Sequence, residues 1–210
     1  MAAPRTTTQP QTTTTVAPAV ANPGPLGLCG FALTTFVLSM VNNGVLKEAD
    51  LGAVIGLALF YGGLAQLLAG MWEFRAGNTF GATAFASYGA FWLSFAALLV
   101  PGLSNPALKP SNTGLGYYLL GWAIFTGIMA IGSLRTNGAT AVVFVLLFLT
   151  FLLLAIGKFS QGTATTNTGI YTIGGWVGVL TALAAWYTAM AGILASVSGG
   201  RIALPVYPLG

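Results

Sequence analysis

Six apolar stretches, each about 20 residues long, dominate the sequence. They cover residues 25–41, 51–72, 80–100, 114–132, 138–157 and 173–197. An α-helix needs about 20 apolar residues to cross the ~30 Å hydrocarbon layer of a membrane. Backbone polar groups in lipid must bond within their own segment, so each stretch is expected to be a helix rather than an open strand. The sequence therefore predicts an all-α membrane protein with six transmembrane helices.

Charged side chains are scarce. Of the 210 residues, seven are Lys or Arg and three are Asp or Glu, whereas a soluble domain carries charge on roughly a quarter of its residues. These few charges are not enough to cover a water-facing surface. We therefore expect the outer surface to face a lipid bilayer. The basic residues are spread one to a connection, although binding nucleic acid would require them to cluster on one face. Nucleic acid is therefore not an expected partner.

The residue types that carry most enzyme chemistry are missing or isolated. The chain has no His, its only carboxylates are Glu48, Asp50 and Glu73, and Cys29 is its single cysteine. A general base that works near neutral pH is therefore absent, and neither a disulfide nor a cysteine-based zinc site can form within the chain. We expect a protein that is not an enzyme and that holds neither a metal ion nor a cofactor.

Two regions differ in composition. Residues 1–21 are rich in Thr, Pro and Gln and contain no apolar run, which is typical of a disordered tail. The connections between the apolar stretches are too short to hold a second domain. Residues 22–210 are therefore expected to form a single six-span domain.

An even number of spans places both termini on one side of the membrane. Lys and Arg are more frequent in cytoplasmic connections, and the basic residues divide slightly in favour of the side that holds the termini. That side carries Arg5, Arg75, Arg135 and Arg201, and the other side carries Lys47, Lys109 and Lys158. We expect a protein of the cell (plasma) membrane with both termini in the cytoplasm.

Polar side chains recur within the apolar stretches. Thr83, Ser87 and Ser94 fall on one face of the third expected helix, with Tyr88 alongside, and Gln66 lies within the second. Ser and Thr at such depth often join neighbouring helices, but polar faces on several spans also fit a lined passage. A buried amide in lipid must face the bundle. Gln66 is compatible either with a structural hydrogen bond or with a place on that passage.

No charged residue lies at the middle of an expected span. An anion that crosses the bundle would depend on hydroxyls, amides and helix N-termini, or would cross as the neutral acid. Small monocarboxylates fit such a passage better than highly charged solutes, and movement together with protons is compatible with it. Glu73 lies at a span end close to Arg75, so we expect an interfacial ion pair between them, with a proton site at Glu73 as the alternative.

Two long motifs carry a family resemblance. Residues 22–28 read NPGPLGL, and residues 60–94 read FYGGLAQLLAGMWEFRAGNTFGATAFASYGAFWLS. The segments LLLAIGK at 152–158 and GGWVGVLTALAAWYTAM at 174–190 extend the similarity. Together they resemble the acetate uptake transporter family, whose first span opens with N-P-x-P-[LF]-G-L, and the resemblance covers essentially everything after the tail. The one visible departure is Gly24, where the family usually has Ala.

The resemblance implies a set of functional residues and an assembly. It implies a pore constriction formed by Phe31, Tyr88 and Leu149. It also implies a solute path that includes Asn22, Pro23, Pro25, Gln66, Thr83, Ser87 and Thr150. The family assembles as hexamers of six-helix protomers, each with its own pore, so a homohexamer is expected.

The function implied by the resemblance is transport of a small carboxylate. Acetate is the expected solute, with succinate as a further candidate, and the route is either proton symport or channel-like. A urea or amide channel of similar six-helix, hexameric build is the alternative, because a passage without mid-depth charge would suit a neutral solute equally well. A membrane protein that senses or scaffolds is a third class, but it would need a soluble module or a charged recognition loop, and the sequence shows neither.

Overall fold

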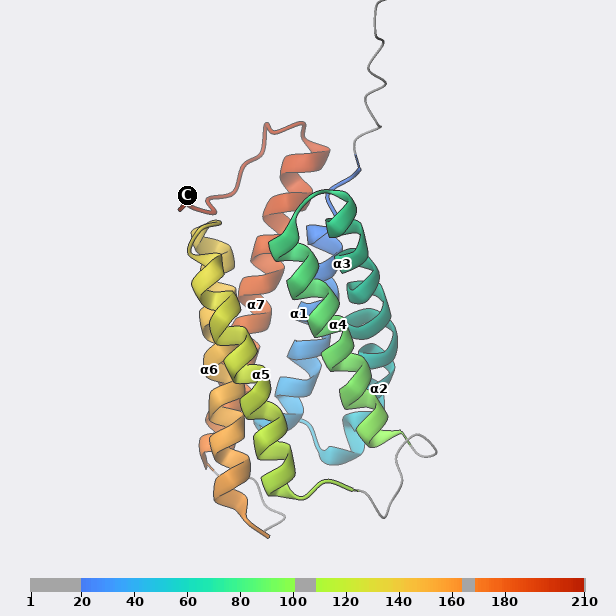
Figure 1. Cartoon of the computed structure of the whole chain (residues 1–210), viewed down its shortest axis with the longest axis vertical. Helices are drawn as coiled ribbons and strands as arrows, with labels where there is room; N and C mark the ends of the chain where they lie inside the picture. Colours follow the sequence, from blue (N-terminus) through green and yellow to red (C-terminus); the bar gives the residue numbers. More distant parts are fainter. Residues whose placement is uncertain (1–19, 101–108, 164–168, 210) are drawn as a thin grey trace, which may run out of the picture.

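The computed structural model describes residues 20–100, 109–163 and 169–209, and every helix in these ranges runs along one bundle axis (Figure 1). The helices are α1 (Gly24–Asn42), η1 (Glu48–Asp50), α2 (Leu51–Leu59), η2 (Phe60–Ala65), α3 (Gln66–Arg75), α4 (Thr79–Leu99), α5 (Asn112–Ser133), α6 (Gly138–Gln161) and α7 (Gly169–Val197). Most of the expected tail, 1–21, lies outside the described residues.

Six of these segments are long and apolar enough to cross a membrane, which confirms the expected number of spans. Five are single helices, and the second span, Glu48–Arg75, combines η1, α2, η2 and α3. Each segment covers one of the apolar stretches of the sequence. Hydrophobicity and length are therefore enough to locate each span.

The second span contains a break that the apolar pattern does not indicate. Phe60–Ala65 is a π-helical turn, and such turns often occur at functional sites. Close packing against α1 accompanies the turn, because a Cβ atom on Gly30 would lie 2.6 Å from the backbone oxygen of Tyr61 and one on Gly62 would lie 2.5 Å from the Thr34 hydroxyl. The turn ends where α3 begins, at Gln66.

Helix packing is tight except between α4 and α5. Helices α1, α5, α6 and α7 pack side by side in the order α5–α6–α7–α1, and α3 packs on α4, whereas the backbones of α4 and α5 approach each other at few points. Aromatic rings fill the space between them: the ring centroids of Phe91 and Trp122 are 5.1 Å apart, and those of Tyr88 and Phe125 are 5.5 Å apart. These aromatic side chains close the gap between α4 and α5.

Both ends of the described chain lie at the same end of the bundle, which we call the termini end (Figure 1). The opposite end is called the far end. After α7 the chain turns back across the termini end and meets the start of α6. There the N–H groups of Gly138 and Ala139 donate to the carbonyl oxygens of Tyr207 (2.7 Å) and Val206 (3.1 Å). The C-terminal segment thus satisfies two backbone donors that a helix start leaves free.

Candidate functional site

Two cavities lie one after the other inside the bundle. The termini-side cavity has a volume of about 450 Å³ and is lined by residues of α1, α3, α4, α6, α7 and the C-terminal segment. The far-side cavity has a volume of about 200 Å³ and is lined mainly by α1, α4, α5 and α6. Phe31 of α1 and Leu147 of α6 line both cavities. These two side chains therefore mark the boundary between the two halves of the bundle.

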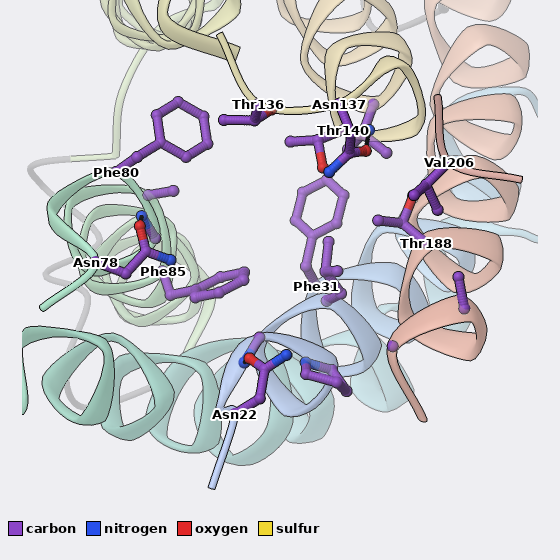
Figure 2. A pocket seen from close by; sticks show the side chains of 18 of the residues that line it. Asn22, Phe31, Asn78, Phe80, Phe85, Thr136, Asn137, Thr140, Thr188 and Val206 are labelled. Atoms are coloured by element: carbon purple, nitrogen blue, oxygen red, sulfur yellow. Dashed lines mark hydrogen bonds between the residues drawn. The ribbon is translucent and has the colours of Figure 1, made fainter. Parts of the chain in front are cut away.

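The boundary between the cavities is apolar and tightly packed. Phe31 is 5% exposed and Leu147 is 3% exposed, and Figure 2 shows the Phe31 ring standing within the termini-side cavity. Tyr88 also lines this cavity, with its ring centroid 6.0 Å from that of Phe31. Its hydroxyl is hydrogen-bonded to the Thr126 hydroxyl of α5 (3.0 Å).

The predicted constriction residue Leu149 lies on the outer face of α6. Leu149 is 38% exposed and lines neither cavity. Two residues correspond to a rotation of about 200° around an α-helix, so Leu147 and Leu149 point to opposite faces of α6. Thr150, in contrast, lies on an inner face: it lines the far-side cavity and its hydroxyl is 3.1 Å from that of Thr181 on α7.

Gln66 lies at the wall of the termini-side cavity. Its side chain is 1% exposed, and its Oε1 atom has no hydrogen-bond partner. A buried amide without partners loses free energy relative to water, and a solute or a water molecule in the cavity could supply the missing partner. Of the two roles left open by the sequence, the absence of a structural partner for Oε1 favours the place on the passage.

The NPGPLGL segment forms the entrance to the same cavity. Asn22 and Pro25 line it, whereas Pro23, which caps the start of α1, does not. The Asn22 Oδ1 atom accepts a hydrogen bond from the N–H of Gly24 (2.9 Å), and Pro25 occupies the first turn of α1, where its missing N–H is not needed. The motif therefore shapes a helix start at a cavity mouth.

Two of the expected path residues lie elsewhere. Thr83 and Ser87 are half-buried and line neither of the two cavities. Ser87 lines instead a shallow groove between α4 and α5, together with residues that include Tyr118 and Trp122. On the same face of α4, the Ser94 hydroxyl is 2.7 Å from that of Tyr118. Ser94 on this face of α4 therefore contacts α5, and the place of Thr83 and Ser87 on the solute path stays a prediction.

The charged residues near the cavities also differ from expectation. Glu73 is 3% exposed and lines the termini-side cavity, whereas Arg75 is exposed, and no ion pair joins them. Residues two apart on a helix do not face each other, which explains why the expected pair is absent. Gln66 and Glu73 are seven residues apart, so they share one face of α3. The seven-residue spacing from Gln66 is the sequence pattern that could have indicated that Glu73 lines the same cavity.

Lys158 is the basic residue that sequence reasoning missed. It is half-buried, lines the far-side cavity, and places its Nζ atom 4.6 Å from the centroid of the Tyr171 ring. The Tyr171 hydroxyl donates to Oδ1 of Asn42 (3.1 Å). Glu48 lines the same cavity and is exposed. The sequence signal that could have identified Lys158 was its position near the end of an apolar span. In the described part of the chain, no three His, Cys, Asp or Glu residues gather as metal ligands.

Comparison with known proteins identifies the family. The sequence model of the GPR1/FUN34/yaaH family matches residues 5–209. The chain belongs to this family. It is 48% identical over 196 residues to acetate permease A of Emericella nidulans, an alignment that covers 89% of this chain and 65% of that protein. It is 40% identical over 187 residues to the succinate-acetate/proton symporter SatP of Escherichia coli K12, covering 89% of this chain and 95% of SatP.

A solved structure supports the same assignment. The bacterial acetate channel SatP superimposes with a TM-score of 0.80 at 39% sequence identity, covering 89% of this chain and 99% of that one. The protein is therefore a member of a family of multi-pass membrane transporters and channels, and it is not an enzyme. It spans 65% of the length of the Emericella nidulans relative.

Proposed function

We propose that this protein carries acetate, with succinate as a further candidate, through the passage formed by the two cavities. The observation that carries the proposal is the arrangement of the cavities, which lie toward opposite ends of the bundle and share Phe31 and Leu147 as lining residues. The names of the relatives, an acetate permease and a succinate-acetate/proton symporter, support a carboxylate as the solute.

The termini-side cavity offers polar groups to a carboxylate as it enters. Asn22, Asn78, Asn137 and Thr140 surround the cavity, with the Phe31 ring between them (Figure 2). Amide and hydroxyl groups replace part of the hydration shell of an anion without holding it as firmly as a fixed cation would. Farther in, the amide of Gln66 can donate to a carboxyl oxygen. The rim residues thus gather the solute and Gln66 orients it.

The constriction sets the size of the solute. Phe31 and Leu147 are buried apolar side chains, and Tyr88 presents its ring beside them while its hydroxyl is bonded to Thr126. Acetate carries a single methyl group past this contact, whereas a longer acid must displace more side-chain atoms. Each additional methylene in an apolar contact changes selectivity by about 1–3 kcal/mol. The passage is therefore expected to favour the smallest carboxylates.

Assembly and orientation follow the family expectation as proposals. We propose a homohexamer in the plasma membrane, each protomer with its own passage, and both termini in the cytoplasm. Large apolar side chains on the outer surface, among them Phe60, Ile128 and Ile131, are available for lipid and for neighbouring protomers. Four basic residues on the side that holds the termini, against three on the other side, support the cytoplasmic orientation.

Uptake of labelled acetate into proteoliposomes tests the proposed function, with protein-free vesicles measuring diffusion of the neutral acid through lipid. We expect acetate uptake well above that background and no protein-dependent uptake of labelled urea. Accumulation against the acetate gradient that is driven by an imposed pH gradient, and is lost when that pH gradient is abolished, would indicate proton symport. Equilibration without accumulation would indicate a channel-like route. Protein-dependent uptake of urea without acetate would overturn the proposal in favour of an amide channel.

A further inference from the structure

Glu73 is a buried carboxyl group without a cationic partner. It lies in α3, two turns after Gln66, is 3% exposed and lines the termini-side cavity. Its Oε2 atom accepts a hydrogen bond from Nδ2 of Asn78 (2.8 Å). None of the Lys or Arg residues within 20–100, 109–163 and 169–209 forms an ion pair with it. Acidic side chains are rarely so buried unless they are paired.

Two helix starts hold the carboxyl group in place. A Cβ atom on Gly24, the first residue of α1, would lie 3.4 Å from Oε1 of Glu73, and one on Gly81, in the first turn of α4, would lie 2.9 Å from its Cδ atom. The positive ends of both helix dipoles therefore favour the ionised form. The N–H groups of Gly24 and Gly81 donate instead to the side chains of Asn22 and Asn78. The charge is thus only partly compensated.

No other fixed charge faces the cavity near Glu73. The segment before α1 contributes Asn22 and the N-cap of α4 is Asn78. Helix α4 contributes Tyr88, the only other ionisable residue among those that line the cavity. Helices α6 and α7 and the C-terminal segment contribute neutral groups: Asn137, Thr140, Thr188, Ala203, Leu204 and Val206 among them. On α3 itself, Arg75 is exposed on another face. An ionised Glu73 therefore gives the cavity a single negative charge.

We propose that Glu73 is the proton-exchange site of the passage, an inference that rests on the proposed function. A carboxylate anion that enters while Glu73 is ionised meets a like charge in an apolar cavity, and two such groups hold one proton between them rather than two charges. Protonated Glu73 can transfer its proton to the solute: its O–H bond breaks, an O–H bond forms on the solute, and Glu73 is left ionised. The neutral acid then passes Phe31 and Leu147. When the solute moves toward the termini end, the neutral acid returns its proton to Glu73, and Glu73 releases that proton at the termini end.

This assignment explains how an anion crosses an apolar constriction that offers no fixed positive charge. Each cycle moves one carboxylate and one proton, and no net charge passes between the cavities. Glu73 regains its proton from water at the open mouth of the termini-side cavity. The hydrogen bond from Asn78 and the two helix starts keep the carboxyl group at the wall in both states.

Proton uptake that accompanies acetate binding tests the assignment. The purified full-length protein is mixed with acetate at matched pH in weak buffer, with a pH-indicator dye for protons and tryptophan fluorescence for binding. We expect the wild-type protein to take up as much as one proton per acetate bound, and Glu73→Gln to bind acetate with no uptake. Asp50→Asn, which alters an exposed carboxylate that lines neither cavity, is the matched control and should behave as wild type.

The outcomes separate this inference from the proposed function. A wild-type protein that binds acetate without taking up protons, or a Glu73→Gln protein that binds it with unchanged uptake, overturns the assignment of Glu73 alone. A wild-type protein that neither binds nor carries acetate overturns the proposed function. If Glu73→Gln does not bind acetate, Asn78→Ala decides. Loss of its hydrogen bond disfavours the ionised carboxylate, so proton uptake should shift to higher pH, and an unshifted profile would contradict the proposal.

Discussion

Replacing Leu147 by Ala should widen the passage where the two cavities meet. Leu147 is 3% exposed and lines both cavities, and the substitution removes three carbon atoms from this contact. At about 0.8 kcal/mol per buried methylene, the lost contacts amount to about 2.4 kcal/mol. A solute with one or two additional methylenes can occupy part of the space that is vacated.

The expected result is a change in selectivity rather than a general gain in rate. One methylene in an apolar contact alters selectivity by roughly 10- to 200-fold. The rate of butyrate uptake relative to acetate should therefore rise at least about tenfold in Leu147→Ala. The assay is uptake of each labelled acid into proteoliposomes at one pH, after subtraction of the rate in protein-free vesicles.

Leu149→Ala provides the matched control, because it is the same substitution two residues away on the same helix. Leu149 is 38% exposed and lines neither cavity, so its removal should leave the butyrate-to-acetate ratio unchanged. The reasoning is refuted if Leu149→Ala raises the ratio and Leu147→Ala does not. Thermal unfolding of both variants is measured in detergent, since a buried Leu→Ala change costs about 2–5 kcal/mol.

Three further predictions concern the packing and the charges. Gly70→Ala would bring a Cβ atom into collision with the backbone nitrogen of Ala86, whereas Gly56→Ala meets no atom within 4 Å. Thermal unfolding should show a loss of about 1–3 kcal/mol for the first and none for the second. Tyr88→Phe removes the hydrogen bond to Thr126 but keeps the ring, so stability should fall by about 1 kcal/mol while acetate uptake persists; loss of uptake would show that the hydroxyl itself serves transport. Lys158→Met removes the half-buried ammonium of the far-side cavity. The apparent affinity for acetate presented from that end should fall roughly tenfold, and this effect should weaken as salt is added. An unchanged affinity would show that Lys158 does not attract the anion.

The spans could be predicted from the sequence because the requirement for a span is local. A hydrocarbon layer demands length and hydrophobicity of each helix separately, and both can be read from residues that are neighbours in the chain. The entrance motif is equally local: Asn22 and Pro25 form a helix start within a few residues. Gln66 stands out for the same reason, since a lone amide in an apolar span must face the protein.

Facing directions could be decided only by the tertiary structure. Between Thr140 and Lys158 the only polar side chain of α6 is Thr150, so the hydrophobic pattern says little about Leu147 and Leu149. Packing of α6 against α5 and α7 determines which of the two points inward. Glu73 and Arg75 are close in the chain but point apart on the helix. The bilayer determines how long each helix is and how apolar, while contacts between helices distant in sequence determine which side chains meet at the centre.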